Sequence, residues 1–210
     1  MKNKLIKIQL SVLLCLMMIA CNGNKKTAEG NDVETSSDTT KVIVKYAEGF
    51  DVIYDGNVRL ITIQDPQHET EAIYRYALVN RGQSHDGIPD GYTIIETPVK
   101  SLICMTTLQL SNFIKLEALD KVVGMTSTHY LFNSEMKQRI KDGRTSKIGI
   151  EGNFDNELIL ALNPEIILVS PFKRGGYESI KDLDIPLVTF LGYKETTPLG
   201  QAEWLKFSAM

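Results

Sequence analysis

Few residues in this sequence have the chemistry of a catalyst. Ser84-His85-Asp86 contains the three side-chain types of a hydrolase triad. Triad members approach one another from separate segments of a chain, however, and three successive side chains cannot adopt that geometry. No G-x-S-x-G nucleophile motif occurs in the 210 residues. We therefore predict an ordinary turn at 84–86 and no hydrolase site.

His129 is the only histidine after residue 98. It could form an acid/base pair with Glu151 or Asp155, so a surface-attached enzyme is one alternative hypothesis. Zinc and manganese sites need several imidazoles together with a carboxylate. A free-metal (Zn or Mn) binding lipoprotein is therefore a second alternative, for which two further ligands are missing. Neither alternative is favoured, and the sequence predicts no catalytic residue, resident metal or cofactor.

The stretch 149–170 predicts the elements around which the chain is organised. Asp155 can cap a short helix, and Glu157 then lies in the first turn, where the helix dipole favours an anion. An Asn-Pro pair ends this helix at about Leu162. The run Ile-Ile-Leu-Val at 166–169 is apolar throughout, as expected for a parallel strand that is buried on both faces. A helix that leads into a buried parallel strand is half of a βαβ unit.

The same alternation extends over the chain from residue 99 onward. A helix capped by Thr107 and a second helix capped by residue 133 or 134 separate the earlier strands. The expected strands are 99–105, 121–125, 166–169 and 186–191. We predict an α/β fold, with an open parallel sheet flanked by helices in one Rossmann-like lobe. In such sheets, ligands bind beyond the carboxyl ends of the strands.

The segment before this lobe reads as a small β-rich extension. Alternating apolar residues at 42–46 and the apolar runs on either side of Asp55-Gly56-Asn57 predict strands and a hairpin turn. Residues 74–79 can add a third strand. Residues 80–98 are rich in Gly, Pro, Asp and Ser, so we expect a loop there that leads into the lobe.

The N-terminus has the pattern of a bacterial lipoprotein signal. Three lysines precede an apolar run at 10–19, which is too short to span a bilayer, and Cys21 follows a small residue. Cys21 is thus the predicted lipidation site; a plain secretory signal or an N-terminal membrane anchor are the alternatives. Residues 22–40 are polar and predict a flexible tether. Removal of residues 1–20 leaves 20 basic against 26 acidic residues, a net charge of −6 with no basic patch for nucleic acid.

At the other end, Thr197-Pro198 predicts the start of a helix that continues to Met210 without a stop signal. We interpret this as a sequence that ends inside a helix; a natural short C-terminal helix is the alternative. The expected organisation is a signal peptide at 1–20, a tether at 21–40, a β-rich extension and loop at 41–98, a ligand-binding lobe at 99–195, and the start of a truncated inter-lobe helix at 196–210.

Taken together, these motifs resemble the N-terminal lobe of class III periplasmic binding proteins, which bind cobalamin, haem and iron-siderophores for ABC importers. The resemblance covers about 99–210 and includes 121–124, 184–188 and the helix start at 196–204. Its central motif is G-x-x-G-x-x-x-x-E-x-x-x-x-L-x-P-[DE] followed by an apolar strand. The matching residues are Gly149, Gly152, Glu157, Leu162, Pro164 and Glu165.

The resemblance implies a lipid-anchored protein on the periplasmic side of a bacterial membrane, with an ABC permease and its ATPase as partners. The transported ligand is then a bulky metal chelate, namely an iron-siderophore, haem or corrinoid. Glu157 matches the glutamate that docks onto arginines of the permease, although stabilisation of the helix dipole alone also explains it. Candidate ligand contacts lie at strand ends and family loop positions, with packing or exposed loop as the alternative: Thr106, Thr107, Tyr130, Phe172, Arg174 and Tyr193.

Overall fold

The computed structural model describes residues 42–68, 72–126, 128–150, 152–170 and 176–210. The predicted signal peptide, the tether, Cys21, Phe172, Arg174 and Glu151 lie outside these residues. None of the helices in the described ranges is both long enough and apolar enough to cross a membrane. Residues 40–210 form one unit.

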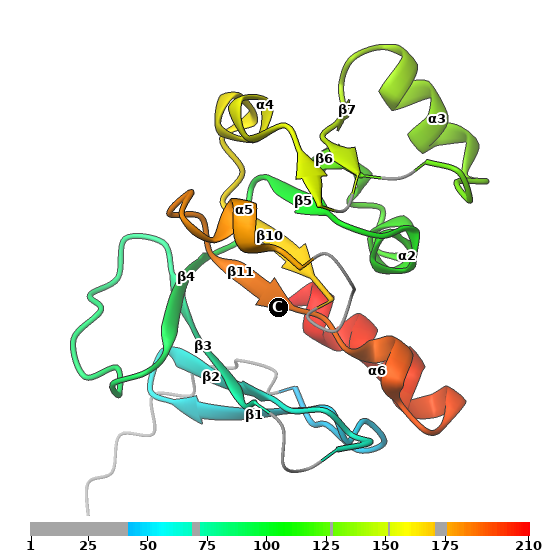
Figure 1. Ribbon diagram of the computed structural model, residues 1–210. Coiled ribbons are helices and arrows are strands. Elements are labelled where there is room, and N and C mark those ends of the chain that lie inside the picture. Colours follow the sequence, from blue (N-terminus) through cyan, green and yellow to red (C-terminus); the bar gives the residue numbers. More distant parts are fainter. Residues whose placement is uncertain (1–41, 69–71, 127, 151, 171–175) are drawn as a thin grey trace, which may run out of the picture. The chain divides into compact units, whose positions relative to one another are not determined.

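Five parallel strands form the central sheet, here called the lobe sheet, and confirm the predicted α/β fold (Figure 1). β10 (Ile166–Val169) is buried at all four positions and lies between two neighbours, as its unbroken apolar run predicted. The spatial order of the strands is β11-β10-β5-β6-β7. The other four strands are β5 (Leu102–Cys104), β6 (Val122–Met125), β7 (Ser146–Lys147) and β11 (Leu187–Thr189).

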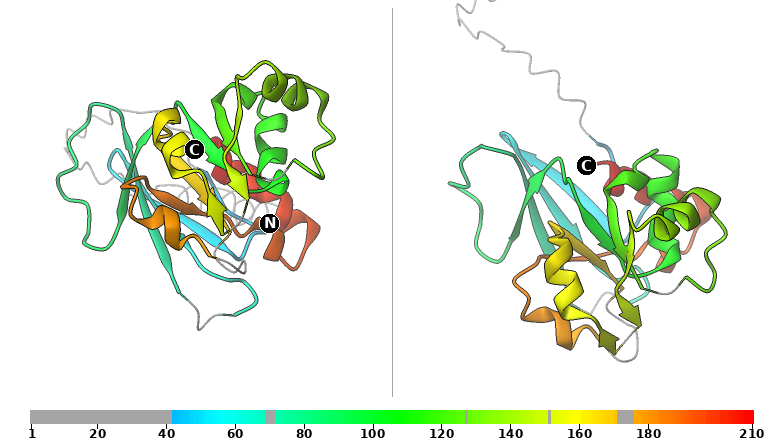
Figure 2. Two further views of the ribbon diagram at one scale, coloured as in Figure 1. Left: turned by 45° about the horizontal axis from the view of Figure 1, so that its top comes forward. Right: turned by 90° about the horizontal axis from the view of Figure 1, so that it is seen from above.

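Helices follow these strands and cover both faces of the lobe sheet. The α-helices of the described residues are α2 (Thr107–Lys115), α3 (Ser134–Lys141), α4 (Asn156–Leu162), α5 (Glu178–Lys181) and α6 (Pro198–Ala209). Two 3-10 turns, η1 (Leu119–Lys121) and η2 (Gly192–Lys194), precede β6 and α6. Figure 2 shows α4 and α5 on the opposite side of the sheet from α6.

Side-chain caps fix where α2, α3, α4 and α6 begin. Asp155 caps α4 as predicted, its carboxylate accepting the Leu158 N–H at 2.9 Å. The expected cap at Thr107 is wrong by one residue: Thr106 caps α2 in a reciprocal capping box with Gln109. Gln109 at the third helical position makes Thr106 the better cap, because its side chain can reach back to the N–H of the capping residue.

The N-terminal segment forms a second sheet of four strands, and β3 confirms the third strand that we expected at 74–79. Its strands, in spatial order, are β1 (Phe50–Asp55), β2 (Val58–Ile63), β3 (Tyr74–Asn80) and β4 (Thr93–Thr97). The predicted hairpin turn is confirmed between β1 and β2, where Gly56 has a φ of 57°. The prediction of a loop throughout 80–98 is wrong, because β4 pairs in parallel with β3.

The two sheets share one hydrophobic core. Phe50, Ile61 and Tyr76 of the N-terminal sheet pack in one cluster with Leu102 and Leu168 of the lobe sheet, and with α2 and α6. A second cluster lies on the other face of the lobe sheet, where Ile103, Met105, Ile167 and Val169 pack against α4 and α5. Burial on both faces explains why the lobe strands are apolar runs rather than alternating patterns.

Tyr76 joins the N-terminal sheet to the free edge of β11. Its hydroxyl accepts the Thr189 N–H at 2.9 Å and donates to the Leu187 carbonyl oxygen at 3.1 Å. One side chain thereby satisfies two backbone groups that a neighbouring strand would otherwise pair, and it covers an edge that could attract another chain. Burial raises the pKa of Tyr76, so the hydroxyl stays protonated and keeps its donor.

Candidate functional site

The candidate site is the edge of the lobe sheet at which its strands have their carboxyl ends, here called the carboxyl edge. Thr106 follows β5 closely, Thr126 follows β6, Ser170 follows β10 and Tyr193 follows β11 within η2. Because all five strands are parallel, the segments that follow them lie along the same edge. Residues that are far apart in the sequence therefore meet there.

Hydrogen bonds to the protein itself occupy the hydroxyl groups of this edge. The Thr106 hydroxyl accepts the Gln109 N–H at 3.3 Å, and Thr107 is the first, half-buried residue of α2. Thr126 is buried and donates to the Met105 carbonyl oxygen at 2.6 Å. Thr106 and Thr107 thus lie at the carboxyl edge, and their role as ligand contacts stays a prediction.

Large apolar side chains project from the carboxyl edge into solvent. Tyr130 and Phe132, which follow β6, are 69% and 82% exposed. Leu108 in the first turn of α2, Ile150 after β7 and Tyr193 after β11 are exposed as well. Five exposed large apolar residues thus lie on the segments that follow the strands at this edge, and side chains of this kind suit a ligand with apolar faces.

Sequence reasoning found two of these five residues and missed Leu108, Phe132 and Ile150. It identified Tyr130 and Tyr193 as candidates, and both lie at the carboxyl edge. A signal for the missed residues was present, because each follows a predicted strand at a position where a loop or a first helical turn is usually polar. Phe132 also has the Lys137 ammonium group 5.8 Å from its ring centroid, which places a cation beside the apolar surface.

A group of polar residues lies beside Tyr193 at the β11 end of the edge. Lys194 forms an ion pair with Asp65, a buried residue that follows β2 in the N-terminal sheet. Burial would raise the pKa of Asp65, but hydrogen bonds from Lys194, the Gln67 N–H and His68 outweigh it and hold the pKa below its ordinary value. Burial, followed by the charge of Asp65, raises the pKa of Tyr193, so its hydroxyl remains a donor.

Glu157 lies on the surface of α4, as required of a docking residue. Its side chain is exposed in the first helical turn. The approach to α4 is a short antiparallel pair, β8 (Gly149–Ile150) with β9 (Asn153–Phe154), separate from the lobe sheet. Gly149 has a φ of +97°, and a Cβ there would collide with the Asn153 carbonyl oxygen. Both facts explain why the first position of the sequence motif is a glycine.

The described residues of the catalytic and metal alternatives make contacts of their own, while Glu151 lies outside the described ranges. The Ser84 hydroxyl donates to the Asp86 carboxylate at 2.6 Å within a turn, as predicted, while His85 lies 3.8 Å from Glu96. The His129 ring packs edge-on against Tyr130. The described part of the chain contains no group of three or more His, Cys, Asp or Glu residues able to hold a metal ion. Burial raises the pKa of the Cys104 thiol far above its ordinary value, which keeps it protonated and unreactive.

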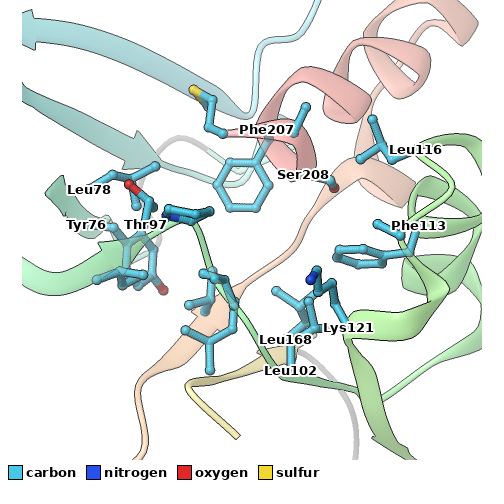
Figure 3. Close-up of a pocket in the computed structure, with 18 of the residues that line it drawn as sticks. Tyr76, Leu78, Thr97, Leu102, Phe113, Leu116, Lys121, Leu168, Phe207 and Ser208 are labelled. Atoms are coloured by element: carbon cyan, nitrogen blue, oxygen red, sulfur yellow. The ribbon is translucent and has the colours of Figure 1, made fainter. Parts of the chain in front are cut away.

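A cavity of about 340 Å³ lies elsewhere, between the two sheets (Figure 3). Phe113 of α2 and Phe207 of α6 project into it, together with side chains of β3 and of the lobe sheet. Leu102, Ile166 and Lys121 lie at or just before the amino ends of their strands, so the cavity is at the opposite edge of the lobe sheet from the exposed aromatic residues. We therefore do not include it in the candidate site.

Comparison with known proteins identifies relatives that are themselves lipoproteins. No protein-family model matches the chain. Two uncharacterized lipoproteins of Methanocaldococcus jannaschii are 23% and 25% identical to it, over 94% and 95% of this chain. The chain spans about half the length of these relatives, 55% of one and 54% of the other.

Several solved structures are similar to part of the chain. The petrobactin-binding protein YclQ of Bacillus subtilis has a TM-score of 0.41 at 14% identity, covering 71% of this chain and 48% of its own. SirA of Staphylococcus aureus in complex with staphyloferrin B has a TM-score of 0.39 at 21% identity, covering 55% and 40%. The vitamin B12 binding protein BtuF of Vibrio cholerae has a TM-score of 0.35 at 14% identity, covering 52% and 47%. Each of these three is described as a binding protein or as a complex with a bound ligand, which is the kind of protein that the sequence resembles.

Proposed function

We propose that the chain is the substrate-binding component of an ABC importer and that it captures a bulky metal chelate, such as haem, a corrinoid or an iron-siderophore. The observation that carries this proposal is the carboxyl edge, where Leu108, Tyr130, Phe132, Ile150 and Tyr193 project into solvent from a rigid parallel sheet. Apolar and aromatic side chains on a fixed scaffold suit recognition of a large ligand.

We further propose that Cys21 carries a lipid that anchors the protein outside the cytoplasm, in the periplasm of a bacterium. The lipoprotein-type signal at 1–21 and the polar tether at 22–40 support this anchoring. The two relatives described as lipoproteins support the membrane-anchored part of the proposal. A tether of this composition lets a binding domain reach away from the membrane toward its ligand.

Calorimetric titration of the chain from residue 22 onward tests ligand capture. The titrants are hemin, cyanocobalamin and a ferric siderophore, and we expect saturable binding of at least one. Calorimetry is preferable to fluorescence, because the single tryptophan, Trp204, is fully buried in the core and far less sensitive to a ligand at the surface. Binding of none of the three would contradict the proposed function.

Phe132→Ala should weaken the observed binding by about tenfold or more, because burial of an aromatic side chain by a ligand is worth about 1.5–3 kcal/mol. Ile53→Ala is the matched control, since Ile53 is 57% exposed on β1 of the N-terminal sheet, away from the lobe strands. Equal affinities of the two variants would show that the carboxyl edge does not contact the ligand.

Glu157 is proposed to dock the protein onto the permease. Charge reversal by Glu157→Arg should lower uptake of the chelate by whole cells by roughly tenfold or more, because like charges that meet across an interface are strongly unfavourable. Affinity of the purified protein for the chelate should not change. Glu178→Arg is the control, a similar reversal at an exposed glutamate in the first turn of α5. Uptake that is equally reduced by both variants would contradict a docking role for Glu157.

A further inference from the structure

The N-terminal sheet reaches the carboxyl edge through the residues that follow β2. Asp65 forms its ion pair with Lys194 of η2. The side-chain Nε2 of Gln67 donates to the Lys194 carbonyl oxygen at 2.8 Å. Phe190 and Leu191 connect β11 to η2, which contains Tyr193. Two contacts thus fasten the segment 64–68 beside an exposed aromatic residue of the candidate site.

His68 is held in a defined orientation within this segment. Its Nδ1 lies 3.3 Å from Oδ2 of Asp65, whose side chain is only 1% exposed, while the His68 side chain is 58% exposed. Asp65 is itself fixed by Lys194 and by the Gln67 N–H, which donates to Oδ1 at 2.9 Å. An anchored carboxylate therefore faces one ring nitrogen, and the rest of the ring extends into solvent.

The carboxylate also selects the state of the imidazole. Asp65 forms an ion pair with Lys194 and accepts the Gln67 N–H, and a carboxylate paired in this way accepts a hydrogen bond from the ring nitrogen that faces it. The neutral ring of His68 therefore carries its proton on Nδ1 and has its lone pair on Nε2. Nε2 makes no hydrogen bond to any described residue, and it points away from Asp65. This is the arrangement in which carboxylate-bound histidines ligate metals.

We propose that His68 ligates the metal of the bound chelate through Nε2, an assignment that rests on the proposed function. A ligand of this kind needs a metal with an open or exchangeable axial position. Planar tetrapyrroles of iron or cobalt have such a position, whereas a hexadentate siderophore leaves none. The apolar side chains of the carboxyl edge, Tyr193 among them, suit the faces of a tetrapyrrole. The inference thus selects tetrapyrroles from the proposed ligand classes.

The other two histidines differ from His68 and provide a control. Nε2 of His85 lies 3.8 Å from the Glu96 carboxylate, so that its outer nitrogen faces an acid, and it belongs to the connection between β3 and β4. His129 packs its ring on Tyr130. His85 is therefore the suitable matched control, an exposed imidazole paired with a carboxylate away from η2.

Titration of the chain from residue 22 onward with hemin, followed by absorbance in the Soret region and by electron paramagnetic resonance, tests this assignment. We expect the wild-type chain and His85→Ala to show imidazole coordination. His68→Ala should lose that signature and bind at least about tenfold more weakly, since even the loss of a residue that only supports a metal ligand costs about 10–100-fold. The far-ultraviolet circular dichroism spectrum of His68→Ala should match that of the wild type, which separates the loss of a metal ligand from misfolding.

The outcomes separate this inference from the proposed function. Hemin binding with an unchanged spectrum in His68→Ala would overturn the assignment of His68 and leave chelate capture in place. Tight binding of ferrioxamine B, a hexadentate complex, at an affinity equal to that of hemin would likewise overturn the preference for tetrapyrroles. Failure of the wild-type chain to bind any chelate would overturn both.

Discussion

Replacement of Trp204 by alanine is expected to lower the free energy of unfolding by about 3–5 kcal/mol. The indole is fully buried, with ring centroids 4.9 Å from Phe50 and from Phe190 and 5.2 Å from Phe207. Its loss opens a cavity where the N-terminal sheet, the residues after β11 and α6 meet. The indole N–H also donates to Oε1 of Glu195 at 2.7 Å, so the substitution removes a partner from a buried carboxylate.

Urea unfolding followed by far-ultraviolet circular dichroism measures this loss. Leu199→Ala is the matched control, because Leu199 lies on the same helix and is 57% exposed; its effect should stay within about 0.5 kcal/mol. Trp204→Phe keeps part of the aromatic volume and removes the N–H donor. Its effect should therefore be intermediate. A loss for Trp204→Ala no larger than that for Leu199→Ala would mean that the two sheets do not share their core through α6.

The parallel lobe was predictable because its signals are local. The apolar run at 166–169, the Asp155 cap and the Asn-Pro stop each specify one feature, and all three agree on a helix followed by a buried strand. Asn163 ends α4 in the left-handed conformation with a φ of 46°, which asparagine tolerates. Local agreement of this kind needs no knowledge of distant contacts.

The N-terminal segment was harder to predict because distant residues decide its structure. The alternation at 42–46 suggested a strand, but residues 42–49 pair with no other strand. Their N–H groups are taken instead by carboxylates more than 140 positions away: those of residues 45–47 by Glu203 and those of residues 48 and 49 by Glu195. No feature within the segment indicates that partner. β4 was missed for a related reason, since the Gly, Pro and Asp residues before it concealed a short strand with Ile95 as its inward residue.

The candidate site was predicted in its location and only in part in its residues. The parallel order of the strands fixes the edge, so Tyr130 and Tyr193 could be found. The role that we propose for His68 could not be predicted from the sequence, because the ion pair between Asp65 and Lys194 joins residues 129 positions apart. A site assembled from two sheets requires the arrangement of both.

Substitution of Glu203 by glutamine should cost about 3 kcal/mol of stability at pH 7. The buried carboxylate accepts the N–H groups of Lys45 and Ala47 at 2.9 and 2.8 Å, together with that of Tyr46, and it pairs with Lys206 at 2.6 Å. Burial opposes its ionisation, but the hydrogen bonds from Lys206 and from these backbone groups lower its pKa from 4.5 to about 2. An amide cannot carry the charge that these four donors stabilise.

The same shift predicts how the effect depends on pH. The pKa of Glu203 in the folded protein lies below its value in the unfolded chain, so protons bind preferentially to the unfolded state. The stabilisation is complete above about pH 4.5 and is lost as the pH falls toward 2. Unfolding free energies of wild type and Glu203→Gln should therefore differ most at neutral pH and converge in acid.

Glu178→Gln, at an exposed ion pair, should differ little from wild type at any pH. A difference for Glu203→Gln that stays constant from pH 7 to pH 2.5 would show that the variant acts through altered packing, and that the charge of Glu203 does not hold the N-terminal segment to α6.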